Sequence, residues 1–433
     1  MNNNPAIIKR SLREELDPFL KRREYIAIRG PRQAGKTTFV KELEKEIRDA
    51  QGPTNFITFE DKGILEIFES DINSFIKLHV LPYKSVFIDE FQYAKGGGQK
   101  LKFIHDTTNV KIIITGSSSL ELQAKTGKYM VGRLVYFELL PFSFTEYLSA
   151  KDENLLALIH DNSVKLKKLL KGEKVIFKDE VTSQTIKSAL TSLLYEYVVY
   201  GGYPSVVLAD NDEVKATLLR NIFQTYISKD IVDLLKLETD SELVKVAQLL
   251  ALQIGNLIVY DNLSKESGLY YELLKKHLDI LSQTYVVELL RPYYTNKRTE
   301  IVKNPTPYFL DTGLRNSLIN SFSPLLERTD KGSLFENFVF SALKRHTYST
   351  QQVKFWRSKS QAEIDFVLEP VIGEVIPIEV KITAGSSVSI GKSFYSFVEK
   401  YKPATAILIT PDKFDQRKVG EQTTLYCIPA SWL

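Results

Sequence analysis

Residues 30–38 read Gly30-Pro31-Arg32-Gln33-Ala34-Gly35-Lys36-Thr37-Thr38 and fit the pattern G-x-x-x-x-G-K-[ST]. A short apolar run at 25–28 precedes this stretch, and a helix-prone run at 39–47 follows it. Glycines at both ends let the backbone fold round an anion, so that N–H groups and the helix N-terminus point at phosphates. The sequence therefore predicts a Walker A loop between a strand and a helix, in which Lys36 reaches the β- and γ-phosphates and Thr37 binds Mg²⁺.

Composition and length indicate a globular protein of several domains. Of the 433 residues, 43% are hydrophobic and 25% are charged, and the net charge of +4 neither points to nucleic acid nor excludes a local basic face. Cys427 is the only cysteine, so no disulfide and no cysteine-based metal site forms within one chain. There is no signal-peptide pattern, and the longest apolar stretch, Tyr197 to Ala209, is too short to span a bilayer. We expect a cytoplasmic protein without membrane contact.

The first part of the sequence alternates apolar, β-branched runs with amphipathic stretches, which include 37–48 and 64–79. Such alternation predicts an α/β fold with a parallel sheet and helical crossovers, whose ligand site lies at the carboxyl ends of the strands. The expected strands are 25–28, 55–59, 85–88 and 110–115.

Two carboxylates follow the apolar run Val86-Phe87-Ile88. Asp89 and Glu90 stand where a strand of the predicted sheet ends. Downstream of a phosphate loop, this Walker B arrangement lets Asp89 hold Mg²⁺ through water while Glu90 orients and activates the attacking water. The second carboxylate favours hydrolysis over simple binding.

Hydroxyl side chains and one arginine complete the expected nucleotide site. The apolar run 112–114 ends in Thr115 and, two residues later, Ser117. If this strand lies beside the phosphate loop, either hydroxyl contacts the γ-phosphate or the water, and a Ser N-cap for the next helix is the alternative. Arg133 is a candidate arginine finger in cis or across a subunit boundary, and a surface salt bridge is the competing interpretation.

The middle of the chain is mostly helical in pattern. Its lysine run, from Lys165 through Lys167 and Lys168 to Lys171, is typical of a solvated helix face, with a nucleic-acid contact as the minority alternative. Residues 261–281 have the rhythm of a helix–turn–helix, in which Leu269, Leu273, Leu274 and Leu278 form the apolar face of the second helix. We predict a wing of two strands around Asn296-Lys297-Arg298, and either DNA contact or protein packing for this element.

The C-terminal part predicts a second, smaller α/β unit with its own polar set. A helix at 333–346 is followed by expected strands at 353–357, 363–369, 375–382 and 406–409. The polar set is Glu336, Asp365, Glu379 and Lys381. Because alternate residues of a strand face the same side, Glu379 and Lys381 project together. Carboxylates of this kind bind one or two Mg²⁺ ions, and a lysine positions a water, as phosphodiester cleavage requires.

Several motifs recur together, in this order, in one known family. They are Gly30-Pro31-Arg32-Gln33-x-Gly35-Lys36-Thr37-Thr38, Asp89-Glu90-Phe91-Gln92, Thr115-Gly116-Ser117-Ser118, Gly132-Arg133, Leu140-Pro141-Phe142-Ser143-Phe144, Gly201-Gly202-Tyr203-Pro204, Tyr308-Phe309-Leu310-Asp311-Thr312-Gly313-Leu314, Gly332-Ser333-Leu334-Phe335-Glu336-Asn337 and Pro377-Ile378-Glu379-Val380-Lys381. The chain resembles AAA+-superfamily P-loop ATPases of the archaeal and bacterial type that carry a C-terminal domain of unknown function.

This resemblance implies a P-loop ATPase core at 1–145, a helical lid with a charged insertion at 146–238, a winged helix at 239–320 and a PD-(D/E)XK, restriction-endonuclease-like domain at 328–433. By their positions in the family's motifs, the ATPase roles are assigned to Lys36, Thr37, Asp89 and Glu90. The nuclease-like roles are assigned in the same way to Glu336, Asp365, Glu379 and Lys381. The expected cofactors are ATP and Mg²⁺, with a second divalent metal site in the C-terminal domain as a further hypothesis.

Three functions fit these observations. The leading one is an ATP-hydrolysing switch or motor, coupled to nucleic acid through the winged helix and the C-terminal domain. The second is a signalling or scaffold ATPase with an inactive C-terminal interaction domain, and the third is an ATP-gated, Mg²⁺-dependent nuclease. The partners to be tested are accordingly ATP and ADP, DNA, another protein and a second copy of the chain.

Overall fold

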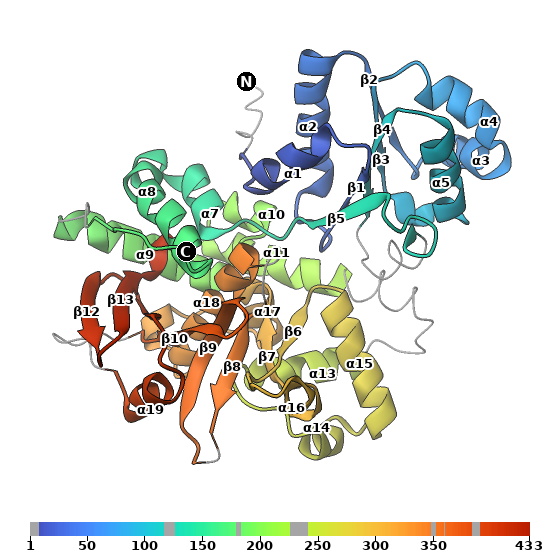
Figure 1. Cartoon of the computed structure of the whole chain (residues 1–433). Coiled ribbons are helices and arrows are strands. Elements are labelled where there is room, and N and C mark those ends of the chain that lie inside the picture. The colour runs from blue at the N-terminus through green and yellow to red at the C-terminus, as the bar shows by residue number, and fades with distance from the viewer. Residues whose placement is uncertain are drawn as a thin grey trace. The chain divides into compact units, whose positions relative to one another are not determined.

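The computed structural model describes residues 8–116, 126–178, 183–225, 241–347, 352–358, 360–382 and 390–433. These residues form two compact units. The first contains the described residues up to Pro141 together with Gln283–Tyr285, and the second contains the other described residues from Phe142 onward. Figure 1 labels the helices and strands of both.

In the described residues, the first unit is built on a five-stranded sheet. The strands are β1 (Tyr25–Arg29), β2 (Thr54–Thr58), β3 (Ser85–Asp89), β4 (Lys111–Gly116) and β5 (Leu134–Glu138). Their order is β2-β3-β4-β1-β5, and every neighbouring pair is parallel. The predicted parallel sheet is confirmed, and β4 lies directly beside β1.

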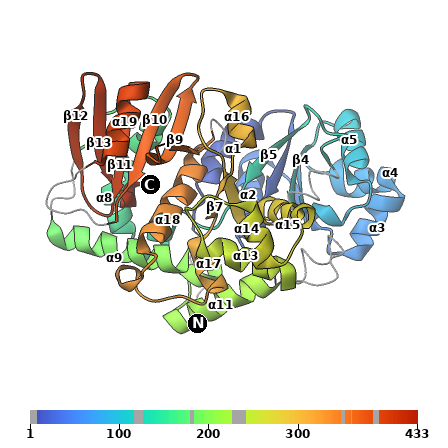
Figure 2. The same cartoon turned by 90° about the horizontal axis from the view of Figure 1, so that it is seen from below.

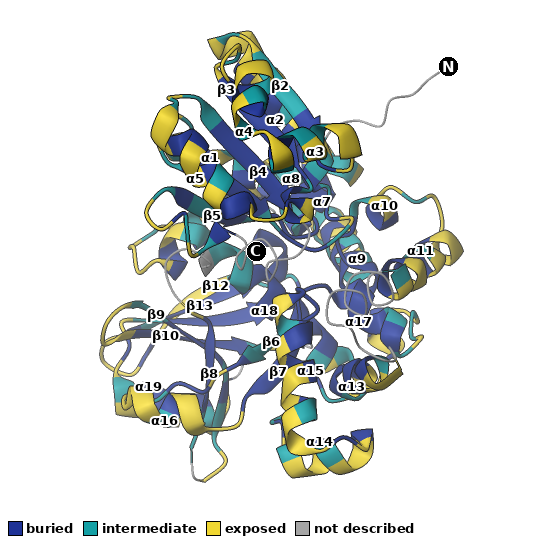
Figure 3. Ribbon diagram, turned by 90° about the vertical axis from the view of Figure 1, so that its right-hand side faces the viewer, coloured by how far each residue is buried: buried dark blue, intermediate teal, exposed yellow. Residues whose placement is uncertain are grey.

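Helices cover both faces of this sheet (Figure 1). They are α1 (Leu12–Leu20) and α2 (Lys36–Gln51) on one face and α3 (Lys62–Ser70), α4 (Ile72–Phe75), the π-helix η1 (Ile76–Val80) and α5 (Gly97–Thr107) on the other. Side chains of β1 alternate between the two cores: Ile26 belongs to the core that includes Val40 of α2, and Ala27 belongs to the core that includes Leu101 of α5. Because helices bury both faces, β3 and β4 are buried along nearly their whole length (Figure 3).

The second unit begins with helices around a glycine turn. The helices are α7 (Phe144–Lys151), α8 (Glu153–Leu170), α9 (Gln184–Tyr200), α10 (Pro204–Val207) and α11 (Asp212–Thr225). Between α9 and α10, the N–H of Gly202 donates to the buried carboxylate of Asp311 at 2.8 Å. A Cβ at Gly201 would lie 2.2 Å from the same carboxylate, so this turn requires glycine. The Asp311 carboxylate also accepts the N–H of Leu314, and this bond caps the N-terminus of α17 (Thr312–Leu318).

The predicted helix–turn–helix is present, but its strand pair lies elsewhere than expected. Helix α13 (Ser241–Leu252) precedes α14 (Tyr260–Ser267) and α15 (Tyr271–Gln283). The strands β6 (Val287–Leu290) and β7 (Thr306–Phe309) then pair antiparallel. The prediction of strands around Asn296-Lys297-Arg298 is wrong, because the Asn296 side chain accepts the N–H of Arg298 and starts α16 (Lys297–Val302).

Helix α16 is attached to the C-terminal sheet of the same unit. Glu300 and Lys354 form a buried ion pair at 2.8 Å. Lys297 pairs with Glu369 at 2.8 Å, and the N–H of Tyr293 donates to the carbonyl of Phe355 at 2.5 Å. The connection between β6 and β7 is therefore packed against the sheet instead of projecting as a free wing.

The C-terminal sheet is mixed and has six strands in the described residues. They are β8 (Lys354–Arg357), β9 (Glu363–Val371), β10 (Glu374–Val380), β11 (Thr405–Thr410), β12 (Asp415–Val419) and β13 (Thr423–Pro429). Their order is β12-β13-β11-β10-β9-β8. Helix α18 (Lys331–Thr347) lies beside this sheet, and α19 (Lys392–Tyr401) packs on it through Phe394 and Phe397 (Figure 2). The predicted α/β character of this part is confirmed. None of the helices in the described ranges combines the length and hydropathy needed to cross a membrane.

Replacing Glu300 by alanine leaves the ammonium of Lys354 buried without its carboxylate. We expect the second unit to lose about 3–5 kcal/mol of unfolding free energy. Denaturant unfolding followed by tryptophan fluorescence measures this loss, because the only two tryptophans of the chain, Trp356 and Trp432, belong to this unit.

The matched control is Glu369→Ala, whose partner Lys297 is 54% exposed. We expect this variant to lose about 1 kcal/mol or less. Equal losses in the two variants would show that the Glu300–Lys354 pair does not hold α16 on the sheet.

Candidate functional site

The loop between β1 and α2 has the backbone that an anion cradle needs. Gly30 and Gly35 have φ values of 154° and 92°, and Gln33 adopts a φ of 59° between them. A Cβ at Gly30 would lie 2.1 Å from the carbonyl oxygen of Leu139, so no other residue fits there. The glycines thus allow both the left-handed turns and the close packing of the loop on the segment after β5.

Lys36 points back into this loop. Its side chain is buried, and its Nζ donates to the carbonyl oxygens of Gly30 at 2.9 Å and Pro31 at 2.8 Å. A buried ammonium inside a ring of backbone groups is suited to a phosphate anion, which offers a stronger acceptor than a carbonyl. The residues present therefore fit the triphosphate of a nucleotide.

The hydroxyl expected to bind Mg²⁺ meets the first Walker B carboxylate. Thr37 Oγ1 donates to Asp89 Oδ2 at 2.8 Å, and the hydroxyl of Thr115 donates to the other oxygen of Asp89. Thr115 Oγ1 also accepts the N–H of Glu90 at 3.4 Å. The structure thus brings Lys36, Thr37, Asp89 and Thr115 together at the carboxyl edge of β1, β3 and β4. Hydroxyl and carboxylate oxygens are the ligands that Mg²⁺ prefers.

Glu90 has a strained backbone directly after β3. Its φ of 54° lies in the left-handed region, which costs a residue with a side chain about 1–2 kcal/mol. The side-chain amide of Gln92 donates to its carboxylate. This conformation turns the chain between Asp89 and Glu90. The sequence analysis assigned no role to Gln92. Its only signal in the sequence is its position two residues after Glu90.

Two predicted residues of the nucleotide site, Ser117 and Arg133, are still to be considered. Ser117 lies outside the described residues. Arg133 precedes β5, and its carbonyl accepts the N–H of Tyr25 at the start of β1, whereas the phosphate loop follows the end of that strand. A five-residue strand is about 16 Å long, so Arg133 is at the opposite edge of the sheet from Lys36. Its guanidinium pairs with Asp106 at 3.0 Å. A role in cis is therefore wrong on geometric grounds. The pair with Asp106 is the surface salt bridge of the competing interpretation, and a role across a subunit boundary stays a prediction.

The predicted polar set of the C-terminal part converges in the second unit. Glu336 lies on α18, Asp365 on β9 and Glu379 on β10. Lys381 is the first residue after the end of β10. The register that pairs Ile378 with Phe366 brings Glu379 opposite Asp365. Lys381 Nζ donates to Glu379 at 2.8 Å, and the N–H of Val380 donates to Asp365 at 2.7 Å.

Burial and mutual repulsion shift the protonation of these carboxyls. Burial raises the pKa of Glu336 to about 7, against the opposing hydrogen bond from Tyr308 and with added repulsion from Glu363 and Glu379. Burial, followed by the charges of Glu336 and Glu379, raises the pKa of Asp365 well above its usual range. Two buried carboxyls this close cannot both ionise easily, so the cluster holds a proton near neutral pH.

Two neighbours of this cluster were missed at the sequence level. The Tyr308 hydroxyl, from β7, donates to Glu336, and Glu363 adds charge from β9. Glu363 stands two residues before Asp365, so strand alternation alone would have found it. Tyr308 comes from a distant element, and no local pattern points to it.

The hypothesis of a second metal site lacks support. Across the described ranges, no group of three or more His, Cys, Asp and Glu side chains is arranged so as to hold a metal ion. In this structure Lys381 and Tyr308, two donors, occupy acceptor positions on Glu379 and Glu336.

Three family models match consecutive parts of the chain. The AAA domain model matches residues 22–148, and two models of domains of unknown function (DUF8612 and DUF4143) match residues 191–325 and 331–432. The first match confirms the predicted recognition of a P-loop ATPase core of the AAA+ type. The other two carry no assigned activity, so the nuclease-like interpretation stays a prediction.

Similar proteins are known in both archaea and bacteria. An uncharacterised protein of Methanocaldococcus jannaschii is 26% identical over 349 residues, which cover 79% of this chain and 71% of that protein. One of Haemophilus influenzae is 26% identical over 352 residues, covering 80% of this chain and 76% of that protein. Among solved structures, the Aeropyrum pernix ORC2 protein in its ADP form aligns with a TM-score of 0.31 at 12% identity, over 66% of this chain and 88% of that one. AMPPCP-bound DnaA from Aquifex aeolicus aligns with a TM-score of 0.28 at 12% identity, over 64% and 89%.

The raised pKa of Glu336 predicts a pH-dependent stability. A carboxyl whose pKa rises from 4.5 to about 7 on folding stabilises the fold below pH 4.5 and loses that contribution as pH rises through 7. Glu336→Gln removes this titration, so between pH 5 and 8 the variant should gain about 2.5 kcal/mol relative to the wild type. Denaturant unfolding followed by tryptophan fluorescence at both pH values gives the difference.

Glu369→Gln is the control, because the pKa of Glu369 is lowered through its bond with Lys297, in spite of burial. Its stability relative to the wild type should not change between pH 5 and 8. A constant difference for Glu336→Gln as well would show that Glu336 is ionised in the folded protein.

Proposed function

Given that residues 22–148 form an AAA domain with a P-loop ATPase fold, we propose that this chain binds ATP with Mg²⁺ and hydrolyses it. One observation supports the proposal above all: Thr37 donates a hydrogen bond to Asp89, and these two expected Mg²⁺ ligands directly adjoin Lys36 and Glu90 in sequence. When bound, Mg²⁺ supplies positive charge that stabilises the transferring phosphoryl group.

The side chains of the loop and of β3 divide the work. Lys36 exchanges its two carbonyl acceptors for phosphate oxygens, and Thr37 and Asp89 hold the ion. Glu90 orients a water and accepts its proton, and Gln92 keeps the carboxylate in place until then. Thr115 connects Asp89 with the backbone of Glu90, so that the two carboxylates keep a fixed spacing.

Arg133 suits hydrolysis in an oligomer. It is partly exposed at the edge of the sheet away from the phosphate loop of its own chain. A guanidinium there reaches a nucleotide only in a neighbouring copy, where it would stabilise the negative charge of the transition state. Self-association is therefore part of the proposal.

Nucleic acid is the partner that the second unit fits best. Helices α13, α14 and α15 followed by β6 and β7 have the element order of a winged helix.

A group of lysines, here called the lysine group, supports the same partner. It comprises Lys167, Lys168, Lys171, Lys174 and Lys178. Within the described residues none of them has an ion-pair partner, unlike Lys165, which pairs with Asp161.

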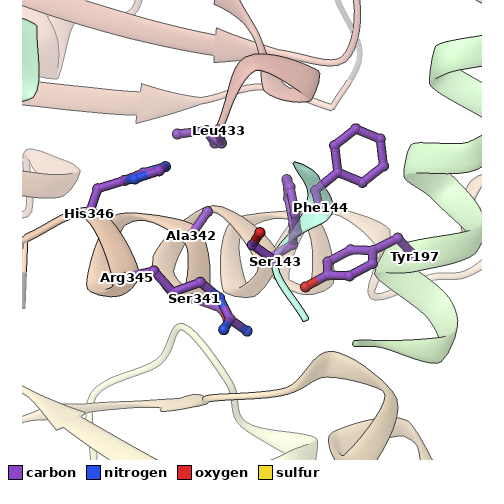
Figure 4. A pocket seen from close by; sticks show the side chains of 9 residues that line it. Ser143, Phe144, Tyr197, Ser341, Ala342, Arg345, His346 and Leu433 are labelled. Atoms are coloured by element: carbon purple, nitrogen blue, oxygen red, sulfur yellow. The ribbon is translucent and has the colours of Figure 1, made fainter. Parts of the chain in front are cut away.

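The lysine group extends to the end of α18. The pKa of His346 falls to about 3 because of burial and the charges of Lys167, Arg345 and Lys171. Figure 4 shows His346 and Arg345 at this end of α18, beside a small pocket that Leu433 also lines. Clustered positive charge of this kind attracts an extended anion such as a phosphodiester backbone.

A nucleotide-switched scaffold is the second candidate. The observation that favours it is the carboxylate cluster, in which Tyr308 and Lys381 bind Glu336 and Glu379. A C-terminal domain whose carboxylates are bound by its own side chains serves as an interaction surface and cleaves no nucleic acid. Cleavage by the C-terminal domain is not part of either proposal.

Glu90→Gln tests the hydrolysis. We expect this variant to bind ATP and Mg²⁺ as the wild type does and to lose turnover by a factor of about 100 or more, because an amide cannot accept the proton from water. Calorimetric titration gives the binding, and phosphate release gives the rate. Lys36→Ala should instead lose the binding itself, and retained hydrolysis in Glu90→Gln would move the catalytic role to another residue.

Replacing Lys168, Lys171 and Lys174 by alanine tests the nucleic-acid partner. Each lysine that contacts a phosphate contributes about 0.9 to the slope of log affinity against log salt for duplex DNA. The triple variant should therefore bind duplex DNA more weakly at low salt, and its slope should fall by about 2–3. Fluorescence anisotropy at several salt concentrations measures both quantities.

A matched control removes Lys41, Lys45 and Lys62, three exposed lysines of the first unit, and so changes the net charge equally. This variant should bind DNA as the wild type does. Absence of salt-dependent binding in the wild type would favour the scaffold function.

A further inference from the structure

Arg10 is a buried arginine that neither the Walker motifs nor the resemblance accounts for. It stands just before α1, and 8% of it is exposed. One guanidinium nitrogen donates to the carbonyl oxygen of Ala34 at 2.9 Å, and the other donates to that of Leu140 at 2.5 Å. A single side chain thus connects the phosphate loop with the segment after β5.

The bond to Ala34 bears on how the loop binds an anion. In a trans peptide the carbonyl of one residue and the N–H of the next point in opposite directions. Since the Ala34 carbonyl points at Arg10, the N–H of Gly35 points away from it. A peptide whose N–H binds the anion must turn its own carbonyl away from that anion. Arg10 therefore holds this peptide in the orientation that binding needs.

The bond to Leu140 attaches Arg10 to the segment that follows β5. The preceding residue, Leu139, packs its carbonyl against Gly30 and donates its N–H to the carbonyl of Arg29 at 2.8 Å. The chain continues through Pro141 to Phe142, where the second unit begins. The segment that leaves the first unit is thus attached to both ends of the phosphate loop, at Gly30 directly and at Ala34 through Arg10.

We propose that Arg10 is a positioning residue for the nucleotide site, which orients the Ala34–Gly35 peptide and couples the phosphate loop to residues 139–141. A guanidinium suits this task because it is permanently charged and its planar fork donates to two carbonyls at once. A lysine in its place offers one point charge and cannot hold both acceptors in a fixed geometry. This inference rests on the proposed ATP binding.

Two variants and a rescue test the inference in the full-length chain. Arg10→Ala should bind ATP about 10–100 times more weakly than the wild type, the effect of losing charge-assisted hydrogen bonds. Arg10→Lys should restore only a small part of the affinity. Millimolar methylguanidinium should strengthen ATP binding by Arg10→Ala, whereas methylammonium at the same concentration should not. Arg13→Met is the control, because Arg13 lies on α1 and pairs with Asp17 and Glu46.

Hydrogen exchange gives a second readout. In the wild type, ATP should slow amide exchange at Leu139 and Leu140, and in Arg10→Ala saturating ATP should not. Wild-type ATP affinity in Arg10→Ala, or lost affinity that methylguanidinium does not restore, would overturn the positioning role. If the wild type itself binds no nucleotide, the proposed function fails, and this result is distinct from a wild type that binds ATP and an Arg10→Ala variant that binds it equally well.

Discussion

The nucleotide site depends on one buried carboxylate, that of Asp89. Burying a carboxylate costs several kcal/mol unless hydrogen bonds compensate for its lost hydration. Asp89 accepts the hydroxyls of Thr37, at the start of α2, and of Thr115, at the end of β4. These bonds require β3, β4 and the helix after β1 to end at the same edge, which the strand order provides. Glu90 and Lys36 reach this edge because they are neighbours in sequence of Asp89 and Thr37.

In the second unit, the buried carboxylate of Asp311 likewise connects separate elements through hydrogen bonds. Asp311 accepts main-chain N–H groups of Gly202 and Leu314, and burial raises its pKa against those bonds. Asn337 on α18 then holds β7 by bonding to both the N–H and the carbonyl of Phe309. The helices after Phe142, the strand pair and α18 are thus joined by buried polar contacts, which explains why motifs far apart in sequence belong to one compact unit.

Local patterns predicted the elements where local forces dominate. Strands β1, β3 and β4 were found because their apolar, β-branched runs are buried on both faces. Strand β5 (Leu134–Glu138), which is only partly buried, was not predicted. The wing was misplaced because Asn296 caps a helix at Lys297–Val302, which Lys354 and Glu369, both distant in sequence, hold through ion pairs. Strand β12 was missed since Asp415–Val419 is a polar, mostly exposed edge strand without an apolar pattern.

The sequence by itself determined the Walker A loop, the paired carboxylates of β3, the parallel sheet and the identity of the polar set in the C-terminal part. These features depend on spacing and alternation along a few neighbouring residues. Only the tertiary structure decided that Arg133 is remote from its own phosphate loop, that Tyr308 binds Glu336 and that Arg10 supports Ala34. Such contacts join residues from separate elements, and their geometry arises when the sheets and helices pack, so that no local pattern encodes it.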